Sequence, residues 1–329
     1  VGAYALEDNT TGTSNTAVGA GSLKNNTTAA QNTAVGIDTL EANTTGAANT
    51  ALGFEALHAN STAANNTGLG WRALYANTTG TGNTAVGVQA LDAVSTGNYN
   101  TGMGVQAGDK LTGSRNTLIG HEAGYGIAAS DDCVAVGKNT LQGTSDADDN
   151  TAIGYAAMQD CTTGYSNTAV GMTALSDITT GYQNVAVGQQ AGLSLTTAVR
   201  NTFIGEDAGY SHTTGADNTY VGKNAGSSST TGVSNVFVGK DAGDSTTTGS
   251  KNIMIGQNTN NNSGATSDHA IVIGHDISND SNYFTFGKAS NIVYNNFTAN
   301  NTWTYNSDAR LKTDVQDSTL GLSFIDSLR

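Results

Sequence analysis

Proline is absent from this 329-residue chain, and aromatic residues make up only 6% of it. A chain without proline keeps a backbone N–H at every position, which suits strands that pair along their whole length. Hydrophobic residues reach 37%, which is little for a large compact core, and Asn, Thr, Ser and Gly dominate the remainder. Disordered chains share such a composition but lack a strict period of apolar positions. The period described below therefore decides between disorder and an extended β structure.

Positive charge is also scarce, because 13 basic residues against 27 acidic ones give a net charge of −14. Nucleic-acid binding depends on basic stripes, so the sequence predicts no nucleic-acid partner. No apolar run of about 18 residues is present, so no membrane span is predicted. Like charge keeps long particles apart and in solution.

Few residues suit redox or metal chemistry. The two cysteines, Cys133 and Cys161, stand at different positions of the repeat, which favours two isolated thiols over a disulfide. The five histidines lack metal-site spacing and are expected to be surface turn residues. Acidic turns at 131–132 and 146–149 offer oxygens suited to calcium, but solvated turns without an EF-hand glycine are the favoured interpretation. No metal and no other cofactor is predicted.

A repeat of 17 residues is the dominant feature of what is present. The motif Asn-Thr-Ala-Val-Gly, or a close variant, starts at positions 15, 32, 49, 66, 83, 100, 116, 133, 150, 167, 184, 201, 218, 235, 252 and 270. Offsets below count from this start, and Gly stands at +4 in every repeat, from Gly19 to Gly274. Such a period is typical of solenoids. The sequence therefore predicts an all-β, parallel β-solenoid or β-roll over residues 1–274, about 75 Å long at roughly 4.8 Å a rung.

Each repeat resembles one rung made of two short β segments. The first covers offsets 0 to +3, Gly at +4 permits a turn, and a second segment with Ala at +7 precedes a polar turn. Offsets +2 and +8 vary together, as Ala17 with Leu23 and Phe203 with Gly209 show. Residues that share one space trade volume in this way, so +2 and +8 are expected to face each other. Two repeats are small at both offsets and are expected to be thin spots: Gly102 with Gly108, and Ala186 with Gly192.

Offset +3 is apolar in every repeat, although adjacent strand residues point to opposite faces. Burial of both +2 and +3 needs cover on both faces of the strand, which an oligomer around an axis supplies. The sequence therefore predicts a homotrimeric fibre. Asn occupies offset 0 in all repeats except those with Cys133 and Ala270. A stacked asparagine column satisfies turn amides rung after rung, and a ligand-binding column is the less favoured alternative.

These Asn-Thr-Ala-Val-Gly rungs resemble the head repeats of trimeric autotransporter adhesins, whose related motif repeats more tightly. The resemblance implies a parallel β-roll in a homotrimer. After Gly274 the pattern breaks, and residues 275–306 alternate like strands, which predicts a β-rich connector. Helical apolar spacing at Leu322, Ile325 and Leu328 predicts a short C-terminal helix.

The motif Ser-Asp-Ala-Arg-Leu-Lys at 307–312, with the apolar stretch at 320–329, resembles the start of a known chaperone. This is the endosialidase-type intramolecular chaperone of phage tail fibres and tailspikes, which trimerises the fibre and then cuts itself off beside the motif serine. The resemblance implies that 307–329 begins such a domain, with Ser307 as nucleophile and Lys312 as general base. A lysine with a lowered pKa can deprotonate a serine without a histidine.

Aromatic residues at the variable offsets +5 and +9 form the candidate receptor site. Phe54 and Trp71 stand at +5 of neighbouring repeats, and His58 and Tyr75 stand at +9. Stacked rungs place such residues side by side, and exposed aromatic patches suit sugar faces. Packing over the turn or against a neighbouring chain is the simpler explanation of the same residues.

The sequence thus predicts an extracellular structural fibre and adhesin that binds a cell-surface glycan or protein receptor. The favoured setting is the virion tail fibre of a phage or a phage-derived surface appendage. A bacterial trimeric surface adhesin or extracellular filament is the main alternative. A polysaccharide-degrading tailspike is less favoured, because it requires paired carboxylates in a groove and the acidic residues are scattered through turns. Apart from self-cleavage, no enzyme activity is expected.

Overall fold

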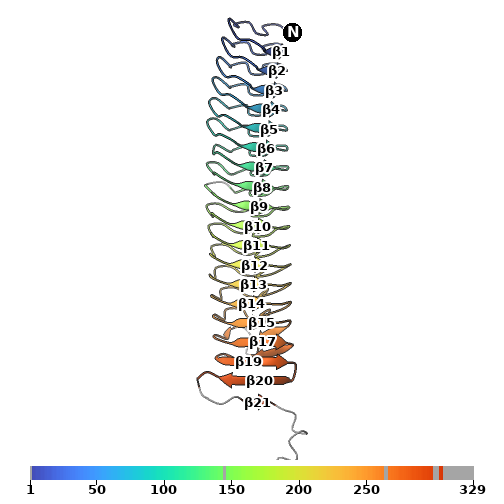
Figure 1. The fold of residues 1–329 in the computed structure, drawn as a ribbon, viewed down its shortest axis with the longest axis vertical. Helices are drawn as coiled ribbons and strands as arrows, with labels where there is room; N and C mark the ends of the chain where they lie inside the picture. Colours follow the sequence, from blue (N-terminus) through green and yellow to red (C-terminus); the bar gives the residue numbers. More distant parts are fainter. Residues whose placement is uncertain (1, 144–145, 263–265, 299–303, 307–329) are drawn as a thin grey trace, which may run out of the picture.

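The computed structural model describes residues 2–143, 146–262, 266–298 and 304–306, and it shows one straight stack of rungs (Figure 1). The predicted parallel β-solenoid with 17-residue spacing is confirmed. Within the described residues there is no helix. Residues 307–329, with the expected C-terminal helix, lie outside the described part of the chain.

Each rung contributes one short strand to a single parallel sheet. The strands are β1 (Thr16–Val18), β2 (Thr33–Val35), β3 (Thr50–Leu52), β4 (Thr67–Leu69), β5 (Thr84–Val86), β6 (Thr101–Met103), β7 (Thr117–Ile119), β8 (Val134–Val136), β9 (Thr151–Ile153), β10 (Thr168–Val170), β11 (Val185–Val187), β12 (Thr202–Ile204), β13 (Thr219–Val221), β14 (Val236–Val238), β15 (Ile253–Ile255) and β17 (Ile271–His275). Equal offsets pair, so that Ala17 lies opposite Ala34 across β1 and β2. Every offset of the repeat therefore forms a column that runs along the fibre.

The ladder continues beyond the last motif. Strand β19 (Tyr283–Lys288) pairs in parallel with β17 and places Gly287 opposite Gly274. Strand β16 (Thr259–Asn261) pairs with β18 (Ile277–Asn279) in a second, two-stranded sheet. Strands β20 (Asn291–Asn296) and β21 (Thr304–Asn306) then run antiparallel and end the parallel stack. The domain boundaries expected at 274 and 306 stay predictions.

The core lies between offsets +2 and +8, as the opposite changes in residue size at these two offsets predict. Leu40 and Ala51 are fully buried, and a Cβ added to Gly226 would lie 2.6 Å from the ring of Tyr220. The prediction that repeats with two small residues at these offsets are thin spots is wrong. A Cβ on Gly108 would lie 2.6 Å from Leu118 and 2.8 Å from Leu91, which belong to the rungs on either side. Side chains thus fill space between rungs as well as within one rung, and a small pair is covered by its neighbours.

Offset +3 is exposed on the single chain, and its predicted cover by further copies stays a prediction. Leu52 is 50% exposed, Met103 45% and Ile255 40%, so one chain does not bury this column. The reason is geometric, because +2 points into the coil and +3 therefore points away from it. The apolar +3 column, called the stripe below, remains uncovered along the whole single chain.

The asparagine column at offset 0 behaves as predicted. The backbone N–H of Asn49 donates to Oδ1 of Asn32 at 2.9 Å, and its Nδ2 donates to the carbonyl of Ala63 at 2.9 Å. Where the column is interrupted, the Cys133 thiol donates to the carbonyl of Ala147 at 2.8 Å and replaces the amide. Both cysteines are free, and burial raises the pKa of Cys133 to about 12 and that of Cys161 to about 11.

A second inward polar column, at offset +11, has no counterpart in the sequence prediction. Its asparagines are buried and bond from rung to rung, with Nδ2 of Asn43 donating to Oδ1 of Asn26 at 3.0 Å and Nδ2 of Asn60 to Oδ1 of Asn43 at 2.9 Å. The ladder ends at Asn77, whose Oδ1 has no partner, because Val94 follows at this offset. Farther along the fibre the same column becomes apolar.

His212 occupies this column too, and its expected place on a surface turn is wrong. The side chain is fully buried, with its ring nitrogens 3.0 Å from the Gly215 carbonyl and 3.2 Å from Oγ of Ser229. It lies edge-on to the rings of Phe203 and Tyr220, which stack on each other at 4.9 Å. Burial lowers the pKa of His212 to about 4. An imidazole kept neutral therefore takes the place of an asparagine amide.

Left-handed backbone at offsets +6, +8 and −1 turns the chain at the corners of each rung. Asp38 and Leu40 both have φ of 51°, and their N–H groups donate along the fibre to Ala20 and Ala56, at 2.9 and 3.1 Å. Non-glycine residues in this region are strained, and they persist where surrounding contacts fix them. The inter-rung hydrogen bonds supply these contacts, so the turns stack as regularly as the strands.

Replacing a glycine of the +4 column is expected to disrupt the stack. Gly205 has φ of 134°, and an added Cβ would lie 2.5 Å from the carbonyl oxygen of Gly222 in the next rung. Gly205→Ala should lower the free energy of unfolding by about 3 kcal/mol or more. Thermal unfolding followed by circular dichroism measures this, with Glu206→Ala, an exposed neighbour in the same turn, as control. Equal midpoints for the two variants would contradict the close contact.

His212 is expected to make stability depend on pH. Its pKa is lowered from 6.5 to about 4 in the fold, so the unfolded chain binds the extra proton between these values. Stability is therefore lost as pH falls from 6.5 towards 4, by about 3 kcal/mol at most. In His212→Asn this loss should disappear when denaturation midpoints at pH 7 and pH 4.5 are compared. His121→Asn, at an exposed histidine, is the control and should keep the wild-type pH dependence.

Candidate functional site

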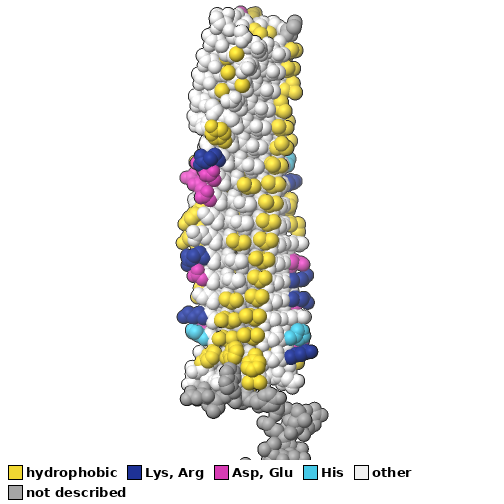
Figure 2. Space-filling model, viewed as in Figure 1, with side chains coloured by type: hydrophobic (Ala, Val, Ile, Leu, Met, Phe, Trp, Pro, Cys, Tyr) yellow, Lys and Arg dark blue, Asp and Glu magenta, His cyan; other side chains and the backbone are white. Residues whose placement is uncertain are grey.

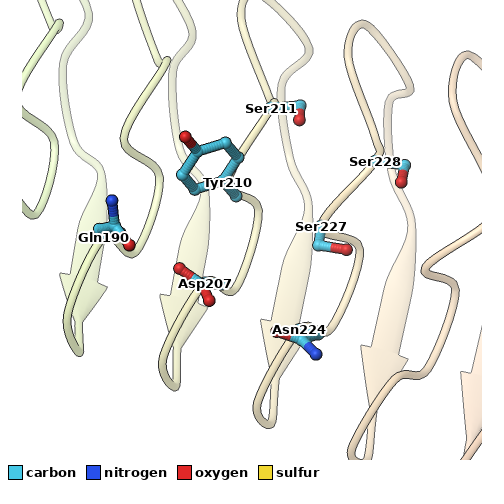
Figure 3. Close-up of a pocket in the computed structure, with 7 residues that line it drawn as sticks. All are labelled: Gln190, Asp207, Tyr210, Ser211, Asn224, Ser227 and Ser228. Atoms are coloured by element: carbon cyan, nitrogen blue, oxygen red, sulfur yellow. The ribbon is translucent and has the colours of Figure 1, made fainter.

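A polar groove follows the turns after the strands, between the side chains at offsets +6 and those at +9 and +10. One hollow along it, of about 500 Å³, lies in the rungs of β11 to β13 (Figure 3). It is lined by Gln190, Asp207, Tyr210, Ser211, Asn224, Ser227 and Ser228. A second hollow, of about 290 Å³, is lined by Gln142, Gly143, Gln159, Asp160 and Thr162. Both hollows lie along the columns at offsets +9 and +10, which run along the fibre with changing side chains.

The larger hollow combines one aromatic ring with hydrogen-bonding groups. The Tyr210 side chain is partly exposed, and carboxylate, amide and hydroxyl groups surround it (Figure 3). Oδ1 of Asp207 is buried without a partner, while Nδ2 of Asn224 donates to Asp241 at 2.8 Å. A flat ring beside hydroxyl and amide groups suits a ligand that offers both an apolar face and hydroxyl groups.

The residues predicted from the sequence lie in the rungs of β3 and β4, at least seven rungs nearer the N-terminal end than the larger hollow. His58 and Tyr75 stack in the +9 column, with ring centroids 5.2 Å apart and planes 17° apart. Phe54 and Trp71 occupy the +5 column of the same two rungs, and both are exposed. The +9 pair thus lines the groove, whereas the +5 pair lies at the edge next to the strands. Their role in receptor binding stays a prediction.

Arg72 joins these residues, and sequence reasoning missed it. Its guanidinium lies 4.1 Å from the ring centroid of Tyr75 and 5.7 Å from that of Trp71, in cation–π geometry. It also pairs with Asp92 at 3.3 Å, and Nε2 of His58 lies 2.8 Å from the Glu41 carboxylate. Offset +6 changes identity in almost every repeat, so no periodic signal in the sequence points to Arg72.

Two carboxylates of the +9 column also come together. Burial raises the pKa of Asp92 to about 6, with Arg72 opposing the shift and Asp109 adding to it. The pKa of Asp109 is raised as well, again chiefly by burial. The acidic residues are therefore less scattered than the sequence indicates, since two of them occupy one column in adjacent rungs.

Unsatisfied polar atoms concentrate along this groove. Five buried side-chain atoms without a partner belong to offsets +6 and +9: Arg72 Nε, Asp92 Oδ1, Asp109 Oδ1, Asn139 Oδ1 and Asp207 Oδ1. Buried polar groups are normally hydrogen-bonded, so each such atom calls for a partner. Of the five residues, Asp207 lines the larger hollow.

The acidic turns considered for calcium are engaged in other contacts. Asp132 pairs with Arg115 at 2.6 Å, Asp131 accepts the Ser114 N–H at 2.6 Å, and Asp148 accepts the Asp131 N–H at 2.8 Å. Among the described residues, no three acidic, histidine or cysteine side chains converge as a metal site requires. In the same part of the chain, no helix is long and apolar enough to cross a membrane. Ser307 and Lys312 lie outside the described residues, and their roles stay predictions.

Comparison with known proteins finds no relative. No protein-family model, no curated protein and no solved structure matches the chain. The function of the chain is therefore inferred from the solenoid and its surfaces.

Proposed function

We propose that this chain is the shaft of a homotrimeric attachment fibre that works outside the cell, on a phage tail or a phage-derived surface appendage. One observation carries the proposal: sixteen rungs stack without interruption and leave an apolar stripe uncovered from end to end. A long particle bonded along its axis suits mechanical reach. The stripe suits association with further copies, because a contiguous apolar surface of this length is unusual on a solitary chain.

The receptor site belongs in the polar groove, and a cell-surface glycan is the favoured ligand over a protein. Tyr210 offers an exposed ring, and the serine hydroxyl and the glutamine and asparagine amide groups around it offer hydrogen bonds to hydroxyl groups. Groove residues change from rung to rung while the core columns repeat. Variable exposed positions on a constant scaffold are where binding specificity normally resides.

The resemblances in the sequence support the same setting. The rungs resemble trimeric autotransporter heads, and residues 307–312 resemble the start of an endosialidase-type chaperone. On this proposal the chaperone assembles the trimer and then releases itself once, with Ser307 as nucleophile and Lys312 as general base. A bacterial trimeric adhesin or surface filament built from the same rungs is the main alternative.

Polysaccharide cleavage is a further candidate, favoured by one observation. Asp92 and Asp109 stand at offset +9 of adjacent rungs, and burial raises the pKa of both. Glycosidases use two carboxylates whose environments separate their roles. Release of reducing sugar by the fibre, abolished in Asp92→Asn, would support this activity over simple attachment.

Glycan binding is expected to depend on the tyrosines of the groove. Tyr75→Ser and Tyr210→Ser remove the ring faces, and each should weaken binding to a glycan array by about tenfold if stacking contributes 1–2 kcal/mol. Tyr99→Ser is the control, because Tyr99 is 67% exposed at offset −1, before the strand. Equal losses in all three variants, or none in any, would contradict a site in the groove.

The trimer is tested by mass. The chain has a mass of 33.3 kDa, so native mass spectrometry or light scattering should give three times this value, and denaturing conditions should return the single chain. Replacing apolar stripe residues by charge, as in Ile153→Lys with Val187→Lys, should shift the population to monomer because the cations stay solvated. Ser228→Lys, at an exposed turn residue, is the control and should leave the trimer intact. A wild-type mass of one chain at every concentration would contradict the proposed trimer.

A further inference from the structure

The strand face of the fibre is uncharged along its length. Offsets +1 and +3 point outward, and in all sixteen motif repeats they hold only Thr, Val, Ile, Leu or Met. Figure 2 shows this face, with apolar side chains running along it and forming two columns towards the C-terminal end. Offset +1 changes from Thr to an aliphatic residue at Val134, Val185, Val236, Ile253 and Ile271, four of them in the C-terminal half. In a chain of net charge −14, such a face is where a like-charged copy meets least repulsion.

Two edges border this face. The leading edge consists of offset −1, directly before each strand, with −2 beside it, and the trailing edge consists of offset +5, directly after the glycine turn. In the rungs of β2 to β6 the trailing edge is apolar and exposed: Ile37, Phe54, Trp71, Val88 and Val105. The leading edge of the rungs of β2 to β4 holds small apolar residues at −2, namely Ala30, Ala47 and Ala64. In the rungs of β2 to β4, large side chains on one edge therefore match small ones on the other.

Charges on the two edges are complementary rung by rung. Three rungs carry a Lys, Arg, Asp or Glu at both −1 and +5, and in each the signs are opposite: Asp132 and Lys138 at β8, Arg200 and Glu206 at β12, and Asp217 and Lys223 at β13. Figure 2 shows the alternation, with acidic and basic side chains facing each other across the strands. Within the chain, each edge already pairs along the fibre, Arg200 with Asp217 at 2.7 Å and Glu206 with Lys223 at 2.9 Å.

We propose that further copies of this chain pack on the strand face in parallel and in register, so that the trailing edge of one copy lies along the leading edge of the next at the same rung. A rotation axis along the fibre brings opposite edges of equal rungs together. An antiparallel arrangement would instead bring like edges of different rungs together. The opposite charges on the two edges of one rung would then not meet across the interface. This rests on the self-association proposed above and adds its face, direction and register.

The charges at β12 and β13 select the register. In register, the Glu206–Lys223 pair of one copy meets the Arg200–Asp217 pair of the next and forms a cluster of four alternating charges. A slip of one rung in one direction sets Lys223 against Arg200, and a slip in the other direction sets Glu206 against Asp217. Single exposed ion pairs contribute little, but like charges placed together disfavour a wrong arrangement.

A copy of this chain fits the face better than an unrelated partner. The stripe repeats at the rung spacing over sixteen rungs, and only a chain with the same spacing keeps equivalent contacts throughout. Standard interfaces use about 20 to 30 residues on each side, and the stripe with its apolar flanks falls in that range. The arrangement places Phe54 and Trp71 between copies and leaves His58 and Tyr75 in the groove.

Cross-linking tests the register. In Lys223→Cys with Asp217→Cys, the two thiols stand on opposite edges of one rung, and mild oxidation should link most chains into species with the mass of the native assembly. A link within one chain would leave the monomer mass. Lys223→Cys with Asp149→Cys is the matched control, because Asp149 lies on the leading edge four rungs away, and it should give almost no linked product. Cys133 and Cys161 are buried, so the wild-type chain should stay unlinked.

A charge swap tests the same contact without thiols. Glu206→Lys with Lys223→Glu keeps the pair within the chain but reverses the trailing edge, and it should weaken self-association by about tenfold or more. Adding Arg200→Asp and Asp217→Arg reverses the leading edge as well, and it should restore association to near the wild-type level. A destabilised fold would not be rescued in this way.

The outcomes separate the two proposals. An assembly of native mass that links through 223 and 149 as well as through 223 and 217, or through neither pair, overturns the register while the trimer stands. The register is also overturned if the variant with both edges reversed does not regain association. A wild-type chain that stays monomeric overturns both. Glycan binding through the groove is measured independently of either result.

Discussion

Hydrogen bonding from each rung to the next is the constraint on which the rest of this molecule depends. Strands, left-handed corners and the asparagine columns all direct their polar groups along the fibre, so a residue bonds chiefly to residues about 17 positions away. The 16-residue repeat starting at Asn100 shows how strict this is. Asn116 still donates its N–H to Oδ1 of Asn100 at 2.9 Å, and Thr101 still pairs with Thr117, while the shortened part is the polar turn. The length of the repeat changes here in the polar turn, and the strand and the asparagine column at offset 0 stay continuous.

Much of the fold could be predicted from the sequence because the constraint repeats. Gly at +4, Asn at 0 and the pairing of a large with a small residue at +2 and +8 each recur many times. Each recurrence indicates the same local geometry. The wrong predictions concern single residues that were interpreted without regard to the column they belong to. His212 is buried because offset +11 faces inward in every rung from β1 to β14 where the structure describes it, although a lone histidine in a polar sequence resembles a turn residue. Gly108 is no thin spot because its space is filled from adjacent rungs.

The candidate site was only partly predictable for the opposite reason. His58 and Tyr75 could be paired because equal offsets of neighbouring rungs must stack. Arg72 and Asp92 could not, because offset +6 changes identity in almost every repeat and gives no periodic signal. Exposed positions thus divide into two kinds. A uniform exposed column, such as +3, fits a partner that is itself periodic, whereas a variable exposed column fits a ligand bound at one place.

The two kinds of surface lie on different segments of the rung, and this separation has a functional consequence. Copies that pack through the strand face leave the turns outward, so each groove is repeated around the fibre axis as many times as there are copies. Linked sites convert later binding events into intramolecular ones, and their combined strength exceeds that of one site by large factors when the receptor is dense. A shallow, open groove with a single ring, such as that at Tyr210, can therefore serve attachment without tight binding of its own. Self-association then contributes to adhesion directly, beyond stiffening the fibre.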